Sequence, residues 1–185
     1  MSIYLQAPLA GAELEKLEEL KAGDRILLNG AIYTARDAAH RKMAEALKEG
    51  GALPFPLEGA VIFYAGPTPA SEGRPAGSIG PTTAARMDPF TVPLLEQGLK
   101  GAIGKGPRSP EVKEAFVRCG AVYLAAVGGV AALLGSRVRA SELVAYPELG
   151  PEAILRLQVV QMPLFVAYDL HGGDIFGGDE GRNER

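Results

Sequence analysis

Glycine and proline interrupt this sequence at short intervals along its whole length. The 24 glycines and 14 prolines make up about a fifth of the 185 residues, and they are spread among apolar segments instead of forming one low-complexity tract. Glycine tolerates backbone angles that other residues avoid, and proline fixes φ. The distribution therefore predicts short helices and strands joined by many tight, shaped loops.

The composition predicts one soluble, folded domain. Hydrophobic residues make up 47% of the chain, enough for a core, and its length is within the roughly 100 to 200 residues of a typical domain. We expect a single domain over residues 1–176 and a flexible tail over 177–185. The N-terminal segment lacks the features of a signal peptide, and no segment reaches the roughly 18 apolar residues of a membrane span.

The charge and the cysteine content exclude several classes of function. A formal net charge of −3 gives no overall attraction to nucleic acid or to an anionic membrane, so any anion site must be local. The single cysteine, Cys119, cannot form an internal disulfide and cannot hold a zinc or iron-sulfur site by itself. We therefore expect no metal ligands in this chain, and a cytoplasmic location fits this cysteine usage best.

Two helices and a hairpin are expected in the first third of the chain. Leucines recur at helical spacing among Glu and Lys over residues 11–21, which predicts a surface helix. The Asn-Gly pair at 29–30 joins two apolar runs and predicts a tight hairpin between paired strands. A helix is expected over 35–49, with Thr34 as its N-cap and Asp37 completing a near capping box.

The rest of the sequence alternates between strand and helix signals. The β-branched and aromatic run at 60–65 predicts a buried strand, and a long loop rich in glycine and proline follows it to Pro81. The other expected elements are strands at 101–103, 121–126, 154–160 and 164–169, and helices at 91–98, 109–118, 129–135 and 151–155. This alternation predicts an α/β fold with a mixed sheet.

The segment TARDAAH (34–40) places an arginine at the start of a helix. The positive end of the helix dipole disfavours a cation there, so Arg36 indicates that an anion lies nearby. The simpler alternative is that Arg36 pairs with Asp37 or with another surface acid.

The segment IGPTTAARMD (79–88) repeats this combination of threonine and arginine. Thr82 or Thr83 can cap a helix, and Arg86 follows one turn later. Hydroxyls, backbone N–H groups and a guanidinium would then converge, as the binding of a carboxylate requires. An ordinary threonine-capped helix with an exposed Arg86 is the alternative.

A third segment, GAIGKG (101–106), places Lys105 on a backbone that is free to approach a ligand. It is not a nucleotide-binding P-loop, because Gly106 follows the lysine where that motif requires Ser or Thr. A solvated surface lysine is the plain alternative. His40 and His171 show no metal-ligand spacing, and we assign no role to them.

Several of these segments, taken in order, resemble the β subunit of two-subunit class I fumarate hydratases and of the related L-tartrate dehydratases. The resemblance covers about residues 8–176. The matching segments are TARDAAH, YAGPTP, IGPTTAARMD, GAIGKG, VGGVAAL and AYPELGPEAI. The resemblance implies a swivelling β/β/α domain with a mixed sheet and flanking helices, which pairs with an α subunit that holds a 4Fe–4S cluster on three cysteines.

The function implied by this resemblance is that of a hydro-lyase subunit in an α2β2 assembly. It would reversibly hydrate fumarate to (S)-malate, a tricarboxylic acid cycle reaction, and would be active only with its α subunit. The resemblance places Arg36, Thr82, Thr83, Arg86 and Lys105 around the dicarboxylate, with Thr83 as the residue that removes the proton. Two rival functions are an L-tartrate dehydratase subunit and a stand-alone regulatory module that binds small dicarboxylates.

Overall fold

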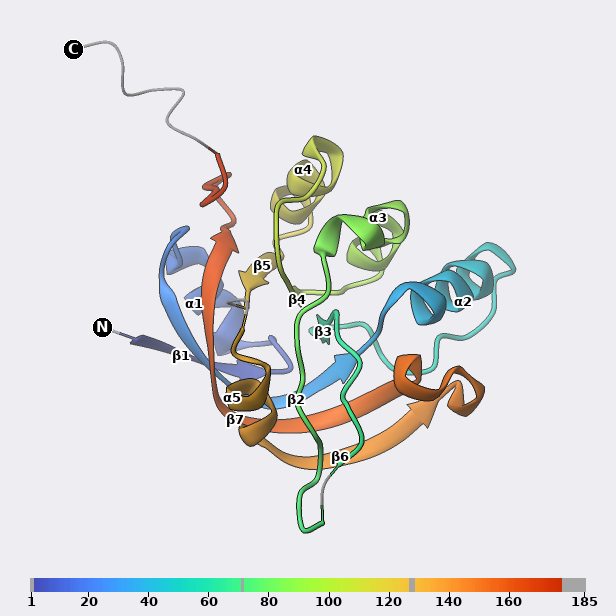
Figure 1. Cartoon of the computed structure of the whole chain (residues 1–185). Coiled ribbons are helices and arrows are strands. Elements are labelled where there is room, and N and C mark those ends of the chain that lie inside the picture. Colours follow the sequence, from blue (N-terminus) through green and yellow to red (C-terminus); the bar gives the residue numbers. More distant parts are fainter. Residues whose placement is uncertain (1, 71, 127–128, 178–185) are drawn as a thin grey trace, which may run out of the picture.

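The sheet of this protein closes on itself. The structure is a computed structural model that describes residues 2–70, 72–126 and 129–177, and in these residues seven strands form one mixed sheet (Figure 1). Their order is β1-β2-β3-β4-β5-β7-β6, and a further pairing between β2 and β7 closes β2, β3, β4, β5 and β7 into a ring. The strands are β1 (Ser2–Ala7), β2 (Arg25–Thr34), β3 (Val61–Phe63), β4 (Gly101–Gly104), β5 (Val122–Ala125), β6 (Val138–Ala145) and β7 (Ile154–Tyr168).

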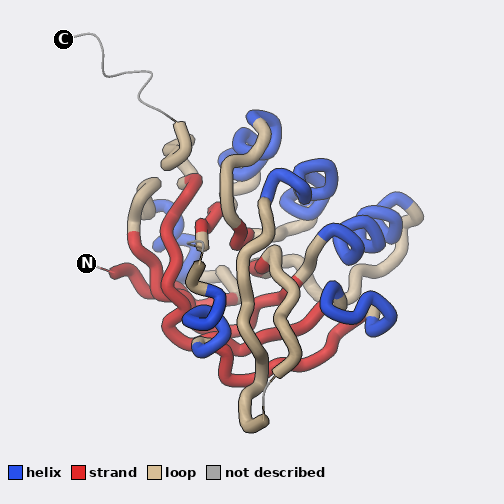
Figure 2. The backbone as a smooth tube through the Cα atoms, in the orientation of Figure 1, coloured by secondary structure: helices blue, strands red, loops and turns tan. Residues whose placement is uncertain are grey.

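Helices make the connections between the parallel strands. The strands β1 to β5 pair with one another in parallel, in the order β1-β2-β3-β4-β5. Strand β7 is antiparallel to each of its partners, β2, β5 and β6. The helices are α1 (Ala12–Glu19), α2 (Asp37–Lys48), α3 (Asp88–Glu96), α4 (Pro110–Arg118) and α5 (Ala131–Ser136), with two 3-10 helices, η1 (Ala84–Met87) and η2 (Pro147–Glu152). Figure 2 shows α2, α3 and α4 in a row outside the ring, and η2 beside α2.

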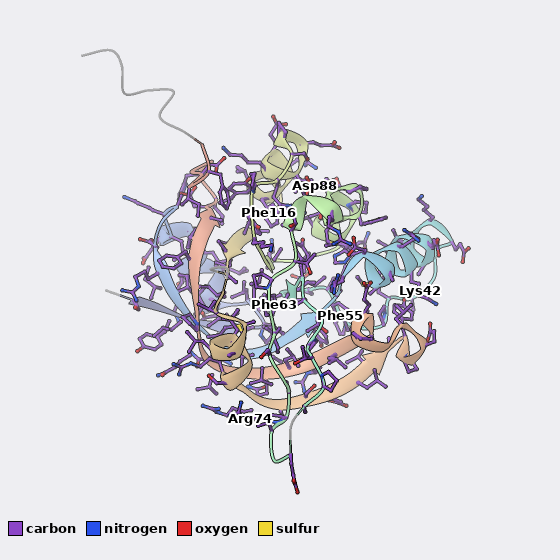
Figure 3. The ribbon with its side chains drawn as sticks, viewed as in Figure 1. Lys42, Phe55, Phe63, Arg74, Asp88 and Phe116 are labelled. Carbon is purple, nitrogen blue, oxygen red and sulfur yellow. The ribbon has the colours of Figure 1, made fainter. Side chains whose placement is uncertain are left out.

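The strands divide their apolar side chains between two cores. In β3, Val61 and Phe63 belong to a cluster centred inside the ring, whereas Ile62 belongs to a cluster that also contains residues of α2, α3 and α4. This alternation follows from the period of two in a strand, which sends successive side chains to opposite faces. Figure 3 shows Phe63 near the middle of the ring and Phe116 under α4. The outer helices are therefore fixed to the ring by buried apolar contact.

The parallel strands bring their C-terminal ends to one edge of the ring. We call this edge the rim and define it as residues 34–38, 64–66, 82–86 and 104–106. Residues 82–86 join it because the backbone N–H of Thr82 donates a hydrogen bond of 2.7 Å to the carbonyl of Tyr64, directly after β3. Sheets of this kind commonly bind ligands at the carboxyl ends of their strands.

The hairpin expected at 29–30 is wrong, because β2 runs unbroken through it. Gly30 has a φ of +99°, but this angle serves a β-bulge, where the register against β7 shifts between Leu28 and Gly30. A Cβ at position 30 would clash with the carbonyl oxygen of Ala7 in β1. The glycine therefore permits the close approach of two strands and does not form a turn.

The capping role expected for Thr34 is also wrong. Thr34 is the last residue of β2, its side chain is buried, and the N-cap of α2 is Arg36. The Thr34 hydroxyl donates to the carbonyl of Ala153 (3.4 Å) and accepts from the backbone N–H of Leu155 (3.1 Å). This hydroxyl therefore ties the end of β2 to the start of β7.

The remaining elements agree in part with the expectations. The helices expected at 11–21, 35–49, 91–98, 109–118 and 129–135 are present with small shifts of their ends, as are the strands expected at 60–65, 101–103 and 121–126. The helix expected at 151–155 is wrong, since η2 ends at Glu152 and β7 begins at Ile154. The strands expected at 154–160 and 164–169 are one strand, β7, and the sequence did not predict β1 or β6.

The architecture confirms an α/β fold with a mixed sheet and flanking helices. Across the described ranges, no helix is both long and apolar enough to cross a membrane. The expected tail falls outside the described residues except for Gly177.

Candidate active site

The five candidate residues lie on the rim. Arg36 follows β2, Thr82, Thr83 and Arg86 lie on the segment that leads into α3, and Lys105 follows β4 directly. Because β2, β3 and β4 are parallel neighbours, the segments that follow them meet at the same edge. The structure therefore brings together side chains that are up to about seventy positions apart in the sequence.

Backbone hydrogen bonds hold the threonines against the lysine. Thr83 and Lys105 form an isolated parallel bridge, in which the N–H of Lys105 donates to the carbonyl of Thr82 (3.3 Å) and the N–H of Ala84 donates to the carbonyl of Lys105 (2.9 Å). Thr83 and Lys105 are both exposed, and Thr82 is half-buried. Thr83 is the N-cap of η1, but its hydroxyl makes no capping hydrogen bond.

Arg86 links this group to the start of α2. Its Nε donates to Oδ1 of Asp37 at 2.8 Å, and Asp37 is the first residue of α2, next to Arg36. The second carboxylate oxygen of Asp37, Oδ2, is buried and has no hydrogen-bond partner among the described residues. The Arg86 side chain itself is about half exposed, so its guanidinium can reach a ligand at the rim.

Arg36 is held from the opposite side by Glu152 of η2. The Nη2 atom of Arg36 lies 3.7 Å from Oε1 of Glu152, and both side chains are mostly shielded from solvent. The Nε of Arg36 is buried and has no hydrogen-bond partner in the described part of the chain. The structure therefore agrees with the simpler alternative, that Arg36 lies beside an acid, and this acid is Glu152 and not Asp37.

The rim therefore contains three cations and the carboxylate of Asp37, and the carboxylate of Glu152 lies beside it. Arg36 and Arg86 each have a carboxylate neighbour, whereas Lys105 makes no ion pair in the ranges that the structure covers. Threonine hydroxyls, guanidinium groups and an ammonium group are the donors that suit a dicarboxylate. A dianion that binds here would replace Glu152 and Asp37 as the carboxylate partners of Arg36 and Arg86.

The sequence analysis missed Arg108, which lies beneath the rim. Its side chain is fully buried, with Nε donating to Oδ1 of Asp88 (2.5 Å), Nη2 to the hydroxyl of Thr91 (2.6 Å) and Nη1 to the hydroxyl of Tyr64 (3.2 Å). These partners come from the end of β3 and from α3, so Arg108 joins the segment after Lys105 to the helix that follows Arg86. No local pattern marks Arg108, because its contacts depend on residues 17 to 44 positions away.

His40, one turn after Arg36, is fully buried beside the apolar cluster that contains residues of α2, α3 and α4. Its Nδ1 lies 2.9 Å from the carbonyl oxygen of Arg36, and its ring packs edge-on against Tyr64 with centroids 5.3 Å apart. Burial lowers the pKa of His40 to about 4, so the imidazole is neutral near pH 7. Because a carbonyl oxygen can only accept a hydrogen bond, the proton of the neutral imidazole is on Nδ1. His40 therefore donates a hydrogen bond to the carbonyl of Arg36, the N-cap residue of α2.

The other sequence candidates lie away from the rim. His171 follows β7 and contacts the carbonyl of Glu18 through Nε2 at 2.7 Å. Cys119 follows α4, and its carbonyl accepts a hydrogen bond from Lys100, just before β4, at the edge opposite the rim. Within the ranges described, no group of three or more His, Cys, Asp and Glu side chains could hold a metal ion. The side chains that the structure describes therefore do not fit an iron-sulfur cluster.

A groove of about 530 Å³ lies apart from these residues, between α2 and α3. Its lining includes Arg41, Lys48 and Phe90, and it contains none of the five candidate residues. The rim and this groove are separate features of the surface.

Comparison with known proteins connects the rim to a family. The family model described as "Fumarase C-terminus" matches residues 2–178, nearly the whole chain. This chain belongs to the fumarase C-terminus family. The family match extends over every segment that contributes to the rim.

Relatives within the fumarase C-terminus family carry two kinds of name. A Methanocaldococcus jannaschii protein named provisionally as an L(+)-tartrate dehydratase subunit beta is 43% identical over 86% of this chain and 85% of its own length. The L(+)-tartrate dehydratase subunit beta of Escherichia coli is 35% identical over 87% of this chain and 81% of its own length. The aerobic class I fumarate hydratase of Salmonella typhimurium is 41% identical over 88% of this chain, but the match spans only 28% of that enzyme.

Proposed function

We propose that this chain is the β subunit of an iron-sulfur hydro-lyase that reversibly hydrates fumarate to (S)-malate. The observation that carries the proposal is the position of Arg36, Thr82, Thr83, Arg86 and Lys105 on one edge of the ring, on the segments that carry the family resemblance. The names of the relatives, which are fumarate hydratases and tartrate dehydratase β subunits, support the same class of reaction.

The three cations bind and orient the two carboxylates of the substrate. Arg36 and Arg86 offer guanidinium groups that can each grip a carboxylate with two bonds, and Lys105 adds a mobile positive charge. Oriented binding brings the reacting carbons to a fixed position, and the same charges stabilise the negative charge that develops next to a carboxylate.

Thr83 moves the proton. In the direction of malate dehydration, its ionised oxygen takes a proton from the carbon next to one carboxylate, the electron pair of that bond forms the double bond, and the hydroxyl on the neighbouring carbon leaves as hydroxide. This hydroxide and the proton that Thr83 removes and later gives up make the water that is released. A threonine hydroxyl is a weak base by itself, and the adjacent Lys105 favours its ionised form. In this proposal the hydroxyl of Thr82, a half-buried residue, donates a hydrogen bond to the substrate.

An α subunit completes the site. The described side chains of this chain do not fit a 4Fe–4S cluster, so the cluster belongs to the partner in this proposal. When bound, such a cluster supplies a Lewis acid for the hydroxyl group that leaves. An α2β2 stoichiometry is part of the proposal, and mass photometry of the purified complex measures it.

L-tartrate dehydration is the second candidate. The matches to tartrate dehydratase β subunits cover more than four-fifths of those proteins, whereas the match to the Salmonella typhimurium fumarate hydratase covers under a third. The two substrates differ by one hydroxyl, which a site distinguishes through buried hydrogen-bond partners. The turnover of each substrate therefore decides between them.

The test is co-expression with a cluster-bearing α subunit under anaerobic conditions, followed by assays with fumarate, malate and L-tartrate. We expect fumarate and malate to interconvert only when both subunits are present and iron is bound. Turnover of tartrate alone would establish the second candidate. An active complex that contains no iron would exclude the hydro-lyase proposal, and tight malate binding by the chain alone, measured by calorimetry, would favour the regulatory module.

A further inference from the structure

The segment AYPELGPEAI, from Ala145 to Ile154, was part of the sequence resemblance, but the proposed chemistry does not use it. It connects β6 to β7, includes η2, and lies along α2 beside the rim (Figure 1). Within it, Glu152 is half-buried and faces the start of α2 through both of its carboxylate oxygens.

Glu152 caps α2 from outside the helix. The first N–H groups of a helix have no partner within it, and a Ser, Thr, Asp or Asn at the N-cap usually accepts a hydrogen bond from one of them. The N-cap here is Arg36, which makes no side-chain capping bond. Instead, Oε2 of Glu152 accepts from the N–H of Ala38 at 3.0 Å. A distant carboxylate therefore allows an arginine to occupy the N-cap position.

The same carboxylate lies beside the guanidinium of Arg36. Oε1 of Glu152 is 3.7 Å from Nη2, which leaves the pair in contact but without a short hydrogen bond. The aliphatic part of Arg36 lies close to Gly66, where a Cβ would come within 3.4 Å of Cδ of Arg36 and 2.5 Å of the Pro151 carbonyl oxygen. The arginine is thus confined between the end of β3 and η2.

The connection that carries Glu152 is itself fixed to α2. Lys42 of α2 forms an ion pair of 2.8 Å with Glu148, and its ammonium lies 5.0 Å from the centre of the Tyr146 ring. Figure 3 shows Lys42 on the side of α2 that faces η2. The hydrogen bonds between the buried Thr34 and the start of β7 set the position of η2, whereas the pair of Lys42 and Glu148 is exposed and contributes little to it.

We propose that Glu152 is a positioning residue that sets the orientation of Arg36 for the carboxylate of the substrate. One oxygen fixes the first turn of α2, and the other limits the directions that the guanidinium can take. Glu152 does not contact the substrate, and its effect is transmitted through Arg36. This role rests on the proposed function, because it assumes that Arg36 binds a substrate carboxylate.

The test compares three substitutions in the assembled enzyme. Glu152→Ala removes the cap and the charge, Glu152→Gln keeps a capping oxygen but removes the charge, and Glu148→Gln is the matched control on the same 3-10 helix. We expect Glu152→Ala to lower kcat/KM by about tenfold, mostly through KM, because a less well oriented Arg36 weakens the binding of the substrate carboxylate. Glu152→Gln should have a smaller effect, and Glu148→Gln should stay within about twofold of the unaltered enzyme.

A double-mutant cycle with Arg36→Ala separates positioning from general stabilisation. If Glu152 acts through Arg36, Glu152→Ala should change kcat/KM by less than about twofold once Arg36 is absent. An equal loss in both backgrounds would overturn the proposal, because the effect of Glu152 would then be independent of Arg36.

Two measurements on the isolated full chain need no turnover. We expect Glu152→Ala, but not Glu148→Gln, to speed hydrogen exchange at the amide of Ala38 and to raise the rate at which phenylglyoxal modifies Arg36. Unchanged rates would contradict the inference directly. Changed rates together with a complex that turns over neither fumarate nor tartrate would support the placement of Arg36 by Glu152 and would reject the hydro-lyase function.

Discussion

Among single residues, Arg86 has the best-defined contact on the rim, and its loss should affect catalysis. Its guanidinium pairs with Asp37 at 2.8 Å while about half of the side chain stays exposed. In the proposed site it binds a carboxylate with charge-assisted bonds, so Arg86→Ala should lower kcat/KM by at least about thirtyfold, or about 2 kcal/mol of transition-state stabilisation. Steady-state kinetics of the assembled enzyme measure this.

Arg118 provides the control for that substitution. It is exposed to a similar degree and pairs with Glu96 at 3.2 Å, away from the rim. Arg118→Ala should leave the kinetics unchanged. Equal kinetics for both variants would show that Arg86 is an ordinary surface residue.

The buried pair of Arg108 and Asp88 should contribute to stability and not only to the site. Asp88→Asn leaves a fully buried guanidinium without its counter-charge, which should lower the free energy of unfolding by about 3 kcal/mol. Urea denaturation of the isolated chain measures the change. Glu96→Gln, which breaks an exposed pair, should cost less than about 1 kcal/mol, and equal losses in the two variants would be inconsistent with burial as the cause.

The buried His40 predicts a pH dependence of stability. The folded chain keeps this imidazole neutral down to a pKa of about 4, whereas the unfolded chain takes up the proton near 6.5. The neutral His40 therefore contributes to the free energy of unfolding fully above pH 6.5, and this contribution is lost as the pH falls towards 4. The loss amounts to about 3 kcal/mol. Denaturation midpoints at several pH values should show this loss in the unaltered chain, and His40→Gln should reduce the dependence between pH 6.5 and 4. The same pH dependence in both would contradict the assignment.

At the scale of elements, the bulge in β2 depends on Gly30. Gly30→Ala places a Cβ against the Ala7 carbonyl at a φ of +99°. Gly23 has nearly the same φ, +98°, but open space around the added Cβ, so Gly23→Ala carries only the backbone strain. We expect Gly23→Ala to cost about 1 kcal/mol and Gly30→Ala at least about 1 kcal/mol more. Similar melting temperatures for the two variants would show that β1 can move aside.

The sequence predicted an element correctly where its local pattern is typical of only one kind of structure. The amphipathic pattern of α2 and the β-branched run of β3 were read correctly. The Asn-Gly pair was misread because positive φ suits a bulge as well as a turn. Strand β6 was not predicted because its sequence lacks an alternation of apolar and polar residues. This strand lies at the edge of the sheet, and most of its residues are exposed.

The candidate site could likewise be predicted only in part. Its candidate residues follow helix starts and glycines that short segments reveal, so the sequence alone selects Arg36, Arg86 and Lys105. Arg108, beneath the rim, and Glu152, beside Arg36, make their contacts with residues far away in the sequence, and the bond from Ala38 to Glu152 spans 114 positions. Such contacts follow from the closure of the ring, which no short segment encodes.

At the scale of the whole molecule, ring closure depends on the last strand. Strand β7 pairs with β2, β5 and β6, and its pairing with β2 extends from Arg25 to Tyr33. A chain that stops at Ala153 would leave β2 and β5 with open edges and an exposed apolar interior. We expect this truncated chain to show no cooperative unfolding transition by circular dichroism, in contrast to the full chain. A cooperative transition in the truncated chain would mean that β7 is an addition to a stable fold.

The position of β7 also determines when the protein can fold during its synthesis. A ribosome makes β2 before the roughly 120 residues that separate it from β7, so the nascent polypeptide carries unsatisfied strand edges while those residues are made. Such edges can pair with other newly made chains, and domains that complete late are exposed to this hazard for longer. Chaperones that cover nascent chains should therefore raise the yield of this protein, because they keep these edges apart until β7 is made.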